Sequence, residues 1–358
     1  MPQHRRRSAR ANRGAACGWN RDAADEPARL GPEASLTAAP EVTVVVPTKD
    51  RWRVLSRAAL PAVLDQEGVD VELVVVDDGS SDGTSERLAD LSDPRVRVVR
   101  HDTARGVAAA RNAGIAAARG RWISFLDDDD LWAPSKLRSQ LDAAAAYGAV
   151  FVYAPGAAVD GAHRFLFNVA APDPSTITDQ LLRWNVIWCG CSNVMARADV
   201  VHELGGFDES FFQLADWDLW IRLALAGPAA ACDDVLVAYT IHSDNMLLTH
   251  QPDVFPEFER LKEKHAAATA AHGAELDGAR FARWVASGHA RAGRRRKAVG
   301  IYLASARRNR DAGAVLRAAG AVLGGPVVTV GRKIIPTDRR SRLTRLALPE
   351  PAWLAAYR

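Results

Sequence analysis

The chain has 358 residues, enough for one large domain and an appendage. Its 48% hydrophobic and 25% charged residues are ordinary for a soluble globular protein, and its longest uncharged run, residues 318–331, is too short to span a membrane. The four cysteines are irregularly spaced, which indicates neither a zinc site nor a disulfide framework and fits a reducing cytoplasm. For the close pair Cys189 and Cys191 we expect a packing role, with redox chemistry as the alternative.

The charge is unevenly distributed, although the net charge of the whole chain is only +3. Residues 291–358 carry 16 Lys and Arg against 3 Asp and Glu, and residues 1–40 carry 7 Arg against 4 acids. The middle of the chain, residues 41–290, therefore has a net charge of about −13. An acidic middle and a basic tail predict different partners for the two parts.

Composition divides the chain into three predicted regions. Residues 1–39 are rich in Arg, Ala, Gly and Pro without apolar periodicity, which predicts a disordered segment. No apolar stretch follows its arginine run, so it does not resemble a secretory signal. We expect residues 40–250 to form an α/β domain and residues 251–358 to form a helical, basic C-terminal region.

Short apolar runs alternate with helical patterns from residue 42 onward. Strands are predicted at residues 42–46, 71–76, 96–99 and 122–126. Helices are predicted at residues 52–66 with a kink or break at Pro61, at residues 84–91 with Thr84 as cap, and at residues 107–119 closed by Gly120. This alternation predicts a mainly parallel sheet with helices on both faces, whose strand ends meet at one edge.

The second half of the domain alternates less regularly, and further strands are expected between residues 150 and 240. Residues 255–320 are predicted to be helical. The expected buried faces of these helices are formed by Phe258, Leu261, Phe281, Trp284, Val285, Val299, Tyr302 and Leu303.

Four consecutive aspartates, Asp127 to Asp130, follow the fourth predicted strand. Adjacent carboxylates repel one another, so such a run is costly unless a cation lies among them. Carboxylate oxygens suit Mg²⁺ or Mn²⁺, and ligands bind at strand ends in open α/β sheets. The run therefore predicts a divalent cation that bridges the protein to a phosphorylated substrate, with a solvated acidic turn as the alternative.

Other polar segments are ambiguous when each is taken alone. Asp77 to Ser80 follow the second strand, where a carboxylate could bind a nucleobase or ribose, but Asp-Gly-Ser is also common in turns. Residues 46–50 are similarly ambiguous. Arg111 lies in the first turns of a predicted helix, where it could reach a phosphate or pair with a neighbouring carboxylate.

Taken together, five blocks of the sequence resemble family 2 of the glycosyltransferases, which have the GT-A nucleotide-sugar fold. The blocks are VVVPTKDR, VVVDDGSSDGT, RGVAAARNAGIAAARGRWISFLDDDDLWAP, GGFDESFFQLADWDLWIRLA and YTIHSDNM, and they fall in family order over residues 42–246. The resemblance implies a Rossmann-like, mostly parallel sheet flanked by helices, here followed by a C-terminal helical extension. It also implies an inverting, metal-dependent glycosyltransferase.

The resemblance assigns roles position by position. Thr48, Asp50 and Asp78 would line the nucleobase and ribose pocket, and Arg111 would lie near the phosphates of the donor. Asp128 would contact the ribose or the metal side of the donor.

The same resemblance assigns the metal, Mg²⁺ or Mn²⁺. Asp129 would be its principal ligand, with Asp127 and Asp130 as further participants. His242 would touch the metal or the diphosphate, and a structural role is its alternative.

Asp216 matches the position of the family's catalytic base at the head of a helix. Asp218 is the competing choice, and spacing alone is equally compatible with a helix cap beside a solvated acid. An aspartate has an ordinary pKa near about 4, so it is ionised at neutral pH and can take the proton of an acceptor hydroxyl. A single displacement of this kind inverts the anomeric centre.

Four tryptophans lie in the second half of the domain. Each could stack on a sugar at the acceptor site, but core packing is the expected role for any one of them. They are Trp184, Trp188, Trp217 and Trp220.

The sequence thus predicts an enzyme that moves a sugar from a nucleotide-sugar donor, UDP-linked, to a hydroxyl of a saccharide or lipid-linked acceptor in glycan or cell-envelope biosynthesis. The alternatives are a non-catalytic nucleotide-sugar-binding protein, which would not need a base such as Asp216, and a sugar nucleotidyltransferase, which would want a glycine-rich loop after the first strand. We expect a cytoplasmic protein whose basic tail binds the anionic inner face of the membrane. A solvated basic helix that pairs with the acidic domain is the alternative, and no nucleic-acid partner is expected.

Overall fold

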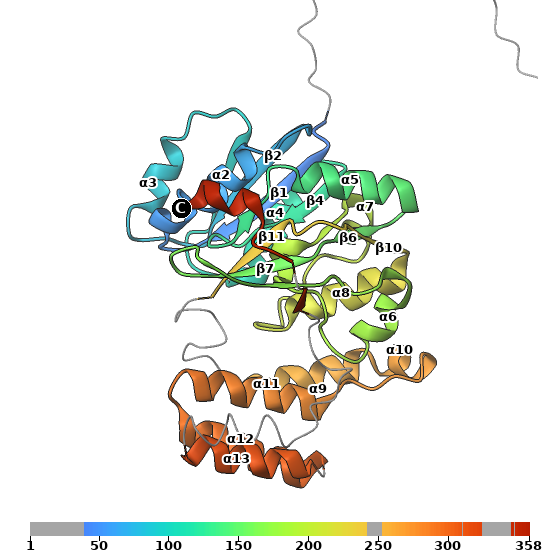
Figure 1. The fold of residues 1–358 in the computed structure, drawn as a ribbon. Coiled ribbons are helices and arrows are strands. Elements are labelled where there is room, and N and C mark those ends of the chain that lie inside the picture. The colour runs from blue at the N-terminus through green and yellow to red at the C-terminus, as the bar shows by residue number, and fades with distance from the viewer. Residues whose placement is uncertain (1–38, 242–252, 310, 324–344, 347) are drawn as a thin grey trace, which may run out of the picture. The chain divides into compact units, whose positions relative to one another are not determined.

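The computed structural model describes residues 39–241, 253–309, 311–323, 345–346 and 348–358 (Figure 1). Almost all of the predicted disordered segment lies outside these residues. The described part contains a seven-stranded sheet in the order β10-β6-β9-β4-β1-β2-β3 and a five-stranded sheet in the order β12-β8-β7-β11-β5. Helices cover the larger sheet on both faces, as the alternation of strands and helices in the sequence predicted.

The parallel half of the large sheet consists of the four strands predicted from the first part of the sequence. They are β1 (Val42–Thr48), β2 (Val71–Asp77), β3 (Val96–Arg100) and β4 (Trp122–Phe125). β1 pairs in parallel with β2 and β4, and β2 pairs in parallel with β3. Every residue of β1 and β2 is buried, which explains their continuous β-branched sequences, because a central parallel strand is covered on both faces.

Alternate residues of β1 pack against helices on opposite faces, as the two-residue period of a strand requires. Val44 belongs to a cluster with residues of α1, α2 and α5, whereas Val45 belongs to a cluster with residues of α4 and α8. The helices of this part of the chain are α1 (Trp52–Leu55), α2 (Ala59–Leu64), α3 (Thr84–Ala89), α4 (Val107–Ala117) and α5 (Lys136–Tyr147).

The helix predicted over residues 52–66 is broken into α1 and α2 at residues 56–58. Proline has no N–H and its ring clashes with the carbonyl four residues earlier, so it is tolerated only in the first turn of a helix. Pro61 is the third residue of α2. The expected break therefore occurs, but it precedes the proline.

Two predicted helix boundaries were wrong. Thr84 is the first residue of α3 instead of its cap, and both its amide and its hydroxyl donate to Asp82. Gly120 does not close α4, which ends at Ala117. Gly120 instead lies so close to β1 that a Cβ atom there would be 2.4 Å from the amide nitrogen of Thr43.

The other half of the large sheet is mixed. It consists of β6 (Phe151–Tyr153), β9 (Met195–Arg197) and β10 (Ala229–Ala231). β9 is antiparallel to both β4 and β6, while β10 is parallel to β6. The helical elements between these strands are η1 (Pro174–Thr176), α6 (Ile177–Leu181), η2 (Gly190–Asn193), α7 (Ala198–Glu203) and α8 (Ala215–Ala226).

The smaller sheet joins distant parts of the chain. Its strands are β5 (Leu131–Trp132), β7 (Gly156–Asp160), β8 (Phe165–Val169), β11 (Val237–Ile241) and β12 (Arg345–Leu346). β5 directly follows the aspartate run and pairs antiparallel with β11. β12 pairs antiparallel with β8, which brings a segment close to the C-terminus back to the sheet.

Residues 255–323 are helical, as expected, apart from short connections and Arg310, which is not described. The helices are α9 (Phe255–Lys264), α10 (Ala266–Ala271), α11 (Gly278–Arg291), α12 (Arg295–Asn309) and α13 (Ala312–Leu323), the last three of which lie side by side (Figure 1). Phe258 and Phe281 are buried and stack with ring centroids 4.1 Å apart. Leu303 was expected to be buried but is 50% exposed.

The last residues of the chain pack against the α/β fold. The 3₁₀ helix η5 (Ala352–Tyr357) buries Leu354 completely, and Trp353 Nε1 donates to the carbonyl oxygen of Val235 at 2.8 Å. The hydroxyl of Tyr357 donates to the carbonyl oxygen of Trp132 at 2.8 Å. The predicted domain boundary at residue 250 stays a prediction. The C-terminal region does not remain separate, because η5 at its end packs against the α/β fold.

The structure also bears on membrane insertion. Among the residues that it describes, we find no helix with the length and apolar character that a bilayer crossing requires.

Candidate active site

The strand ends of β1, β2 and β4 meet at one edge of the large sheet, where the candidate residues gather. The amide of Asp78, just after β2, donates to the carbonyl oxygen of Thr48, the last residue of β1, at 2.9 Å. The aspartate run begins two residues after the end of β4. Ligands of open α/β sheets bind at this carboxyl edge.

The four aspartates of the run point to different partners. Asp130 is fully buried, and its two oxygens accept hydrogen bonds from the Ser192 hydroxyl at 2.5 Å and the Thr240 amide at 2.9 Å. Burial raises the pKa of Asp130 well above its usual value. Asp130 thus ties the run to β11 and to η2, and its participation in metal binding, which the sequence left open, has no support in this geometry.

Asp128 and Asp129 share one guanidinium. Arg51 Nη1 lies 3.2 Å from Asp128 Oδ1, and Arg51 Nη2 lies 2.7 Å from Asp129 Oδ2. The Thr48 hydroxyl donates to the other oxygen of Asp128 at 2.8 Å. Burial raises the pKa of Asp128 to about 7, although the charge of Arg51 opposes the shift. Asp128 and Asp129 thus have the guanidinium of Arg51 as their common cationic partner in this structure.

Asp127 has a separate cationic partner, Arg111. The guanidinium of Arg111 is buried, its Nη2 lies 2.6 Å from Asp127 Oδ1, and it stands 5.4 Å from the ring centre of Phe207. Asp127 is 34% exposed, so this pair is open to a ligand on the carboxylate side. In this structure the guanidinium of Arg111 pairs with the carboxylate of Asp127, and its contact with a donor phosphate stays a prediction.

Asp216 is the second residue of α8 and is half-buried. Its Oδ1 accepts from the Trp217 amide at 2.6 Å, and its Oδ2 accepts from Asn185 Nδ2 at 3.4 Å. Burial raises the pKa of Asp216, and the nearby charge of Arg111 opposes that shift. A partly exposed carboxylate with a raised pKa suits proton abstraction.

The loop that covers Asp216 has an unusual backbone. Gly190 has a φ of +48°, and a Cβ atom there would lie 3.2 Å from Asp216 Oδ2. Cys189 also has a positive φ, +65°, which is uncommon for a residue with a side chain. The glycine therefore lets the loop pass close to the carboxylate of Asp216.

Asp218 differs from Asp216 although it lies on the same helix. It is fully buried and lies within 2.9 Å of nitrogens from three side chains, Arg222, Lys264 and His265. Burial raises the pKa of Asp218, but the hydrogen bonds from His265 and Lys264 and the charge of Arg222 outweigh it, so the pKa is lowered overall. Asp218 therefore holds α8 to the C-terminal helices.

The two remaining donor-site candidates are bonded to neighbouring loops. Asp78 is buried, and its oxygens accept from His101 Nδ1 at 2.7 Å and from the amides of Arg105 and Gly106 at 2.8 and 2.9 Å. Asp50 is exposed, and its Oδ1 accepts from the Ser81 amide at 2.7 Å. In this structure Asp78 thus fixes the loop before α4, and Asp50 lies at the rim of the site.

The metal assignment can be tested against the donor groups present. Among the described residues, no cluster of three or more His, Cys, Asp or Glu side chains could hold a metal ion. Mg²⁺ commonly takes one or two protein carboxylates and completes its shell with water and substrate phosphates. Asp127 and Asp129 supply the two carboxylates that such a site needs. Asp129 already forms an ion pair with Arg51. His242 lies outside the described residues.

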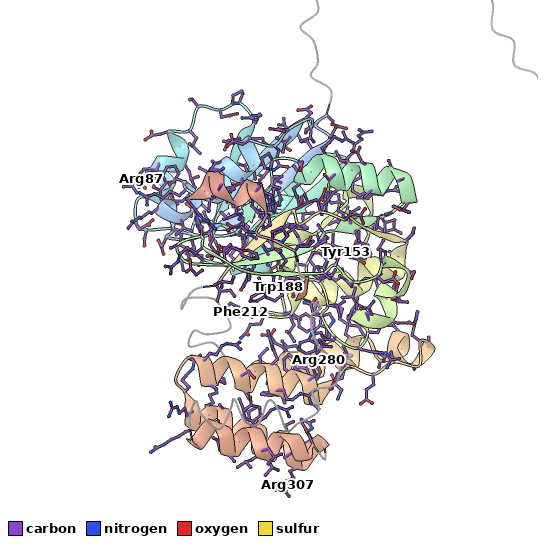
Figure 2. The ribbon with its side chains drawn as sticks, viewed as in Figure 1. Arg87, Tyr153, Trp188, Phe212, Arg280 and Arg307 are labelled. Atoms are coloured by element: carbon purple, nitrogen blue, oxygen red, sulfur yellow. The ribbon has the colours of Figure 1, made fainter. Side chains whose placement is uncertain are left out.

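The four tryptophans differ in burial: two are fully buried and two are half-buried. Trp217 and Trp220 are buried in the core, as expected for tryptophans in general. Trp188 is half-buried and lies against Tyr239, with ring centroids 5.8 Å apart. The guanidinium of Arg280 of α11, which is labelled in Figure 2, lies 4.5 Å from the ring centre of Trp184. Cys189 and Cys191 are both buried free thiols, in keeping with a packing role.

Three residues of the site were not singled out from the sequence. Arg51 is the last residue of the VVVPTKDR block, and no role was predicted for it. Its place in that block is the one sequence feature that could have indicated a role. Asn185 and Ser192 carry no such signal, because each acts only through contacts with residues far away in the sequence.

The strand order, the helices on both faces and the polar strand ends define a GT-A glycosyltransferase fold. Residues 43–205 match the model of the family described as Glycosyl transferase family 2, and the chain therefore carries a family 2 glycosyltransferase domain. The solved structure of TarS 1-349 from S. aureus, in complex with UDP-GlcNAc, has the same fold, with a TM-score of 0.55 and 18% identity over 78% of this chain and 79% of that one.

Curated relatives match parts of the chain. The succinoglycan biosynthesis protein ExoO of Rhizobium meliloti is 48% identical over 115 residues, which are 32% of this chain and 33% of that protein. WfgD of Escherichia coli, named as a UDP-Glc:alpha-D-GlcNAc-diphosphoundecaprenol beta-1,3-glucosyltransferase, is 29% identical over 182 residues, which are 51% of this chain and 69% of that protein. The match thus spans only a third of the length of ExoO.

Proposed function

We propose that this protein transfers a sugar from a UDP-linked donor to an acceptor hydroxyl, with inversion at the anomeric carbon. One observation carries the proposal. At the shared carboxyl edge of β1, β2 and β4, the aspartate run forms two carboxylate–guanidinium pairs, Asp127 with Arg111 and Asp129 with Arg51. The charges of Arg111 and Asp127 act on Asp216 at the start of α8. Paired charges suit a diphosphate leaving group, and a separate carboxylate suits deprotonation of an acceptor.

The donor and acceptor classes follow from the site and from the relatives. Thr48, Asp50 and Asp78 would bind or frame the nucleoside, since they end or follow β1 and β2 at the edge where the aspartate run lies. The name of WfgD gives a UDP-sugar as its donor and a diphosphoundecaprenol-linked sugar as its acceptor. We infer a saccharide or lipid-linked acceptor for this protein too, in the building of a polysaccharide or of the cell envelope.

Asp129 as principal ligand and Asp127 as second ligand would hold Mg²⁺ or Mn²⁺, and His242 is the third proposed ligand. When bound, the ion would supply Lewis-acid stabilisation of the negative charge that grows on the leaving diphosphate. Arg111 would act on the same charge as a fixed hydrogen-bond donor. Asp128, held by Thr48, would orient the donor on the metal side.

Asp216 would act as the general base. As the acceptor oxygen attacks the anomeric carbon, its proton passes to a carboxylate oxygen of Asp216, and the bond from that carbon to the diphosphate oxygen breaks on the opposite face. Attack and departure on opposite faces invert the configuration and need no covalent intermediate. Asp218 could not serve in this way, because its carboxylate is buried among three partners.

A donor panel tests the proposed function. Purified full-length protein with Mn²⁺ is incubated with UDP-sugars and with other nucleotide sugars, and the released nucleoside diphosphate is measured. Release from a UDP-sugar that depends on an added glycan acceptor supports the proposal. Donor binding without consumption would indicate a non-catalytic binding protein, and formation of a nucleotide sugar from a nucleoside triphosphate and a sugar phosphate would indicate a nucleotidyltransferase.

We further propose that the protein works at the cytoplasmic face of the membrane and that its basic C-terminal region binds anionic lipids. Arg295, Arg296 and Lys297 begin α12 and are all exposed, which favours attraction to anionic head groups. Because η5 packs on the sheet, deletion of residues 291–358 would also disturb the fold.

Replacing these three residues with glutamine is therefore the sharper test. Flotation with vesicles of phosphatidylglycerol and phosphatidylcholine should recover the wild-type protein and much less of the triple variant. Equal recovery of both would contradict the lipid proposal. Neutral vesicles provide the control for charge.

A further inference from the structure

Helix α8, which carries the proposed base, begins without a cap of its own. Its N-cap residue, Leu214, offers no side-chain hydrogen bond. The N–H groups at a helix start need partners, and a side-chain oxygen usually supplies one. A side chain from another helix binds just before the first turn: Glu257 Oε2 accepts from the amide of the N-cap residue Leu214 at 3.3 Å and from those of the two preceding residues, Phe212 and Gln213, at 3.1 and 2.9 Å.

Glu257 lies on α9 and is only 7% exposed. Burial of a carboxylate is unfavourable unless hydrogen bonds replace its lost hydration. Three backbone donors do so, and the positive end of the α8 dipole adds to them. The carboxylate and the start of α8 therefore stabilise each other.

The segment that leads into α8, residues 207–214, is held from two sides. On the α9 side, Arg260 Nη2 donates to the Ser210 carbonyl oxygen at 2.7 Å, and Lys264 Nζ lies 2.7 Å from Asp208 Oδ2. Phe212, in the middle of this segment, is marked in Figure 2.

On the other side, the segment is bonded to α4. The side chain of Asn112 both donates to the Phe207 carbonyl oxygen at 2.9 Å and accepts from the Phe207 amide at 2.8 Å. Asn112 directly follows Arg111, the partner of Asp127. The segment thus connects the donor side of the site to the helix that carries Asp216.

A second contact joins α9 to α8 itself. Lys264, at the end of α9, and His265 each place a nitrogen 2.9 Å from Asp218 Oδ1. Asp216 therefore lies between two attachments, the Glu257 amide contacts just before it and the Asp218 contacts just after it. Two attachments fix both the start and the direction of the first turn of the helix.

We propose that Glu257 is a positioning residue for the reaction: through the amides of residues 212–214 it sets the place of Asp216, so the C-terminal helices complete the glycosyltransferase site. This inference rests on the proposed function. It predicts that the loss of Glu257 impairs the chemical step and leaves the donor site, formed by strand ends of the large sheet, intact.

The test compares Glu257→Gln and Glu257→Ala with the matched control Glu259→Gln in the full-length protein. Glu259 lies on the same helix but is paired with Lys262 and Arg308 instead of with the α8 start. We expect kcat to fall about tenfold in Glu257→Gln and about 100-fold in Glu257→Ala, since a displacement of about 1 Å can cost that much. The donor KM and the Kd for UDP should stay within about twofold of wild type in all three.

Hydrogen exchange provides a readout that does not depend on turnover. In Glu257→Gln the amides of residues 212–214 should exchange faster, while those of β1 and β2 stay protected. If no donor is consumed by the wild-type protein, the proposed function fails, and this measurement still decides whether Glu257 anchors the segment. If Glu257→Ala does not fold, both the kinetic and the hydrogen-exchange measurements are made on Glu257→Gln.

Wild-type kcat in folded Glu257→Ala, or unchanged exchange at residues 212–214, would overturn the proposal. So would a loss of UDP affinity in parallel with kcat, since that would show a general disturbance of the fold. A kcat loss in Glu259→Gln equal to that in Glu257→Gln would also overturn it.

Discussion

Arg51 places a guanidinium nitrogen 2.7 Å from a carboxylate oxygen of Asp129, the proposed principal metal ligand. The same guanidinium reaches Asp128 at 3.2 Å. Arg51 therefore already pairs with Asp129, one of the two carboxylates to which the metal is assigned. Metal binding and the Arg51 contact compete, so the side chain is expected to leave Asp129 when the ion enters.

Arg51→Ala tests that competition. Arg51 is 36% exposed, and partly exposed ion pairs are weak, so the affinity for Mn²⁺ should rise only about two- to tenfold. Titration followed by electron paramagnetic resonance of free Mn²⁺ measures it without turnover. The control is Arg53→Ala, an exposed arginine of α1, which should leave the affinity unchanged. Weaker Mn²⁺ binding in Arg51→Ala would contradict the competition.

The raised pKa of Asp216 predicts a pH dependence of the rate. The base must be ionised, so kcat should fall as the pH drops through a pKa that burial has moved above the ordinary carboxyl value. Kinetics between pH 4 and 9 should show this acid limb above about pH 4. An acid limb at or below the ordinary carboxyl pKa would contradict the assignment of Asp216.

The same pKa shift predicts an effect of Asp216→Asn on stability. A carboxyl group with a raised folded-state pKa destabilises the native state increasingly as the pH rises from its unfolded pKa to its folded pKa, and the cost persists above that. Asp216→Asn should therefore unfold at a higher temperature than wild type at pH 7, and the difference should vanish at low pH. Thermal unfolding monitored by circular dichroism measures it, and a lower Tm of the variant at pH 7 would contradict the prediction.

Asp218→Asn should destabilise the protein, because it removes the buried carboxylate that Arg222, Lys264 and His265 share. Breaking a buried ion pair costs about 3–5 kcal/mol, and we expect about 2–3 kcal/mol because Lys264 is 33% exposed. Since the pKa of Asp218 is lowered, its contribution is present at neutral pH and is lost as the pH falls through the folded-state value. Urea denaturation at pH 7 measures the change. Asp208→Asn, which removes a more exposed partner of Lys264, should cost less than about 1 kcal/mol.

The contact of the C-terminal residues with β5 predicts a role in stability. Tyr357→Phe removes one hydrogen bond to Trp132 and should cost about 1 kcal/mol. Trp353→Ala removes both packing and a hydrogen bond and should cost about 2–3 kcal/mol, since Trp353 is only half-buried. Urea denaturation provides the measurement, with Tyr147→Phe as control because Tyr147 is 71% exposed. No loss in Trp353→Ala would show that the tail is dispensable for the fold.

The sequence predicted the framework well where one physical pattern dominates. β1 and β2 are central parallel strands, and burial on both faces leaves an unmistakable run of β-branched residues. The place of the aspartate run followed from β4 for the same reason. Pro61 allowed a break to be foreseen, although its position depended on which turn of α2 would accept the proline.

Pairing between distant residues could not be predicted in this way. Arg51 lies 78 residues before its partner Asp129 in the sequence, and no sequence pattern at either position indicates the pairing. The contacts of Glu257 are still harder to predict, because its partners are backbone amides, which every residue except proline has. The exposure of Leu303 and the return of η5 to the sheet likewise depend on how helices pack, which helical periodicity does not determine.

The central claim is that Asp216 deprotonates an acceptor at a site that binds a UDP-sugar independently of it. The most direct measurement pairs UDP release with calorimetric UDP-sugar binding, in wild type and in Asp216→Asn, both with Mn²⁺. The account predicts a loss of turnover of about 100-fold or more in Asp216→Asn, with the donor Kd unchanged within about twofold. Turnover of Asp216→Asn at the wild-type rate would contradict it.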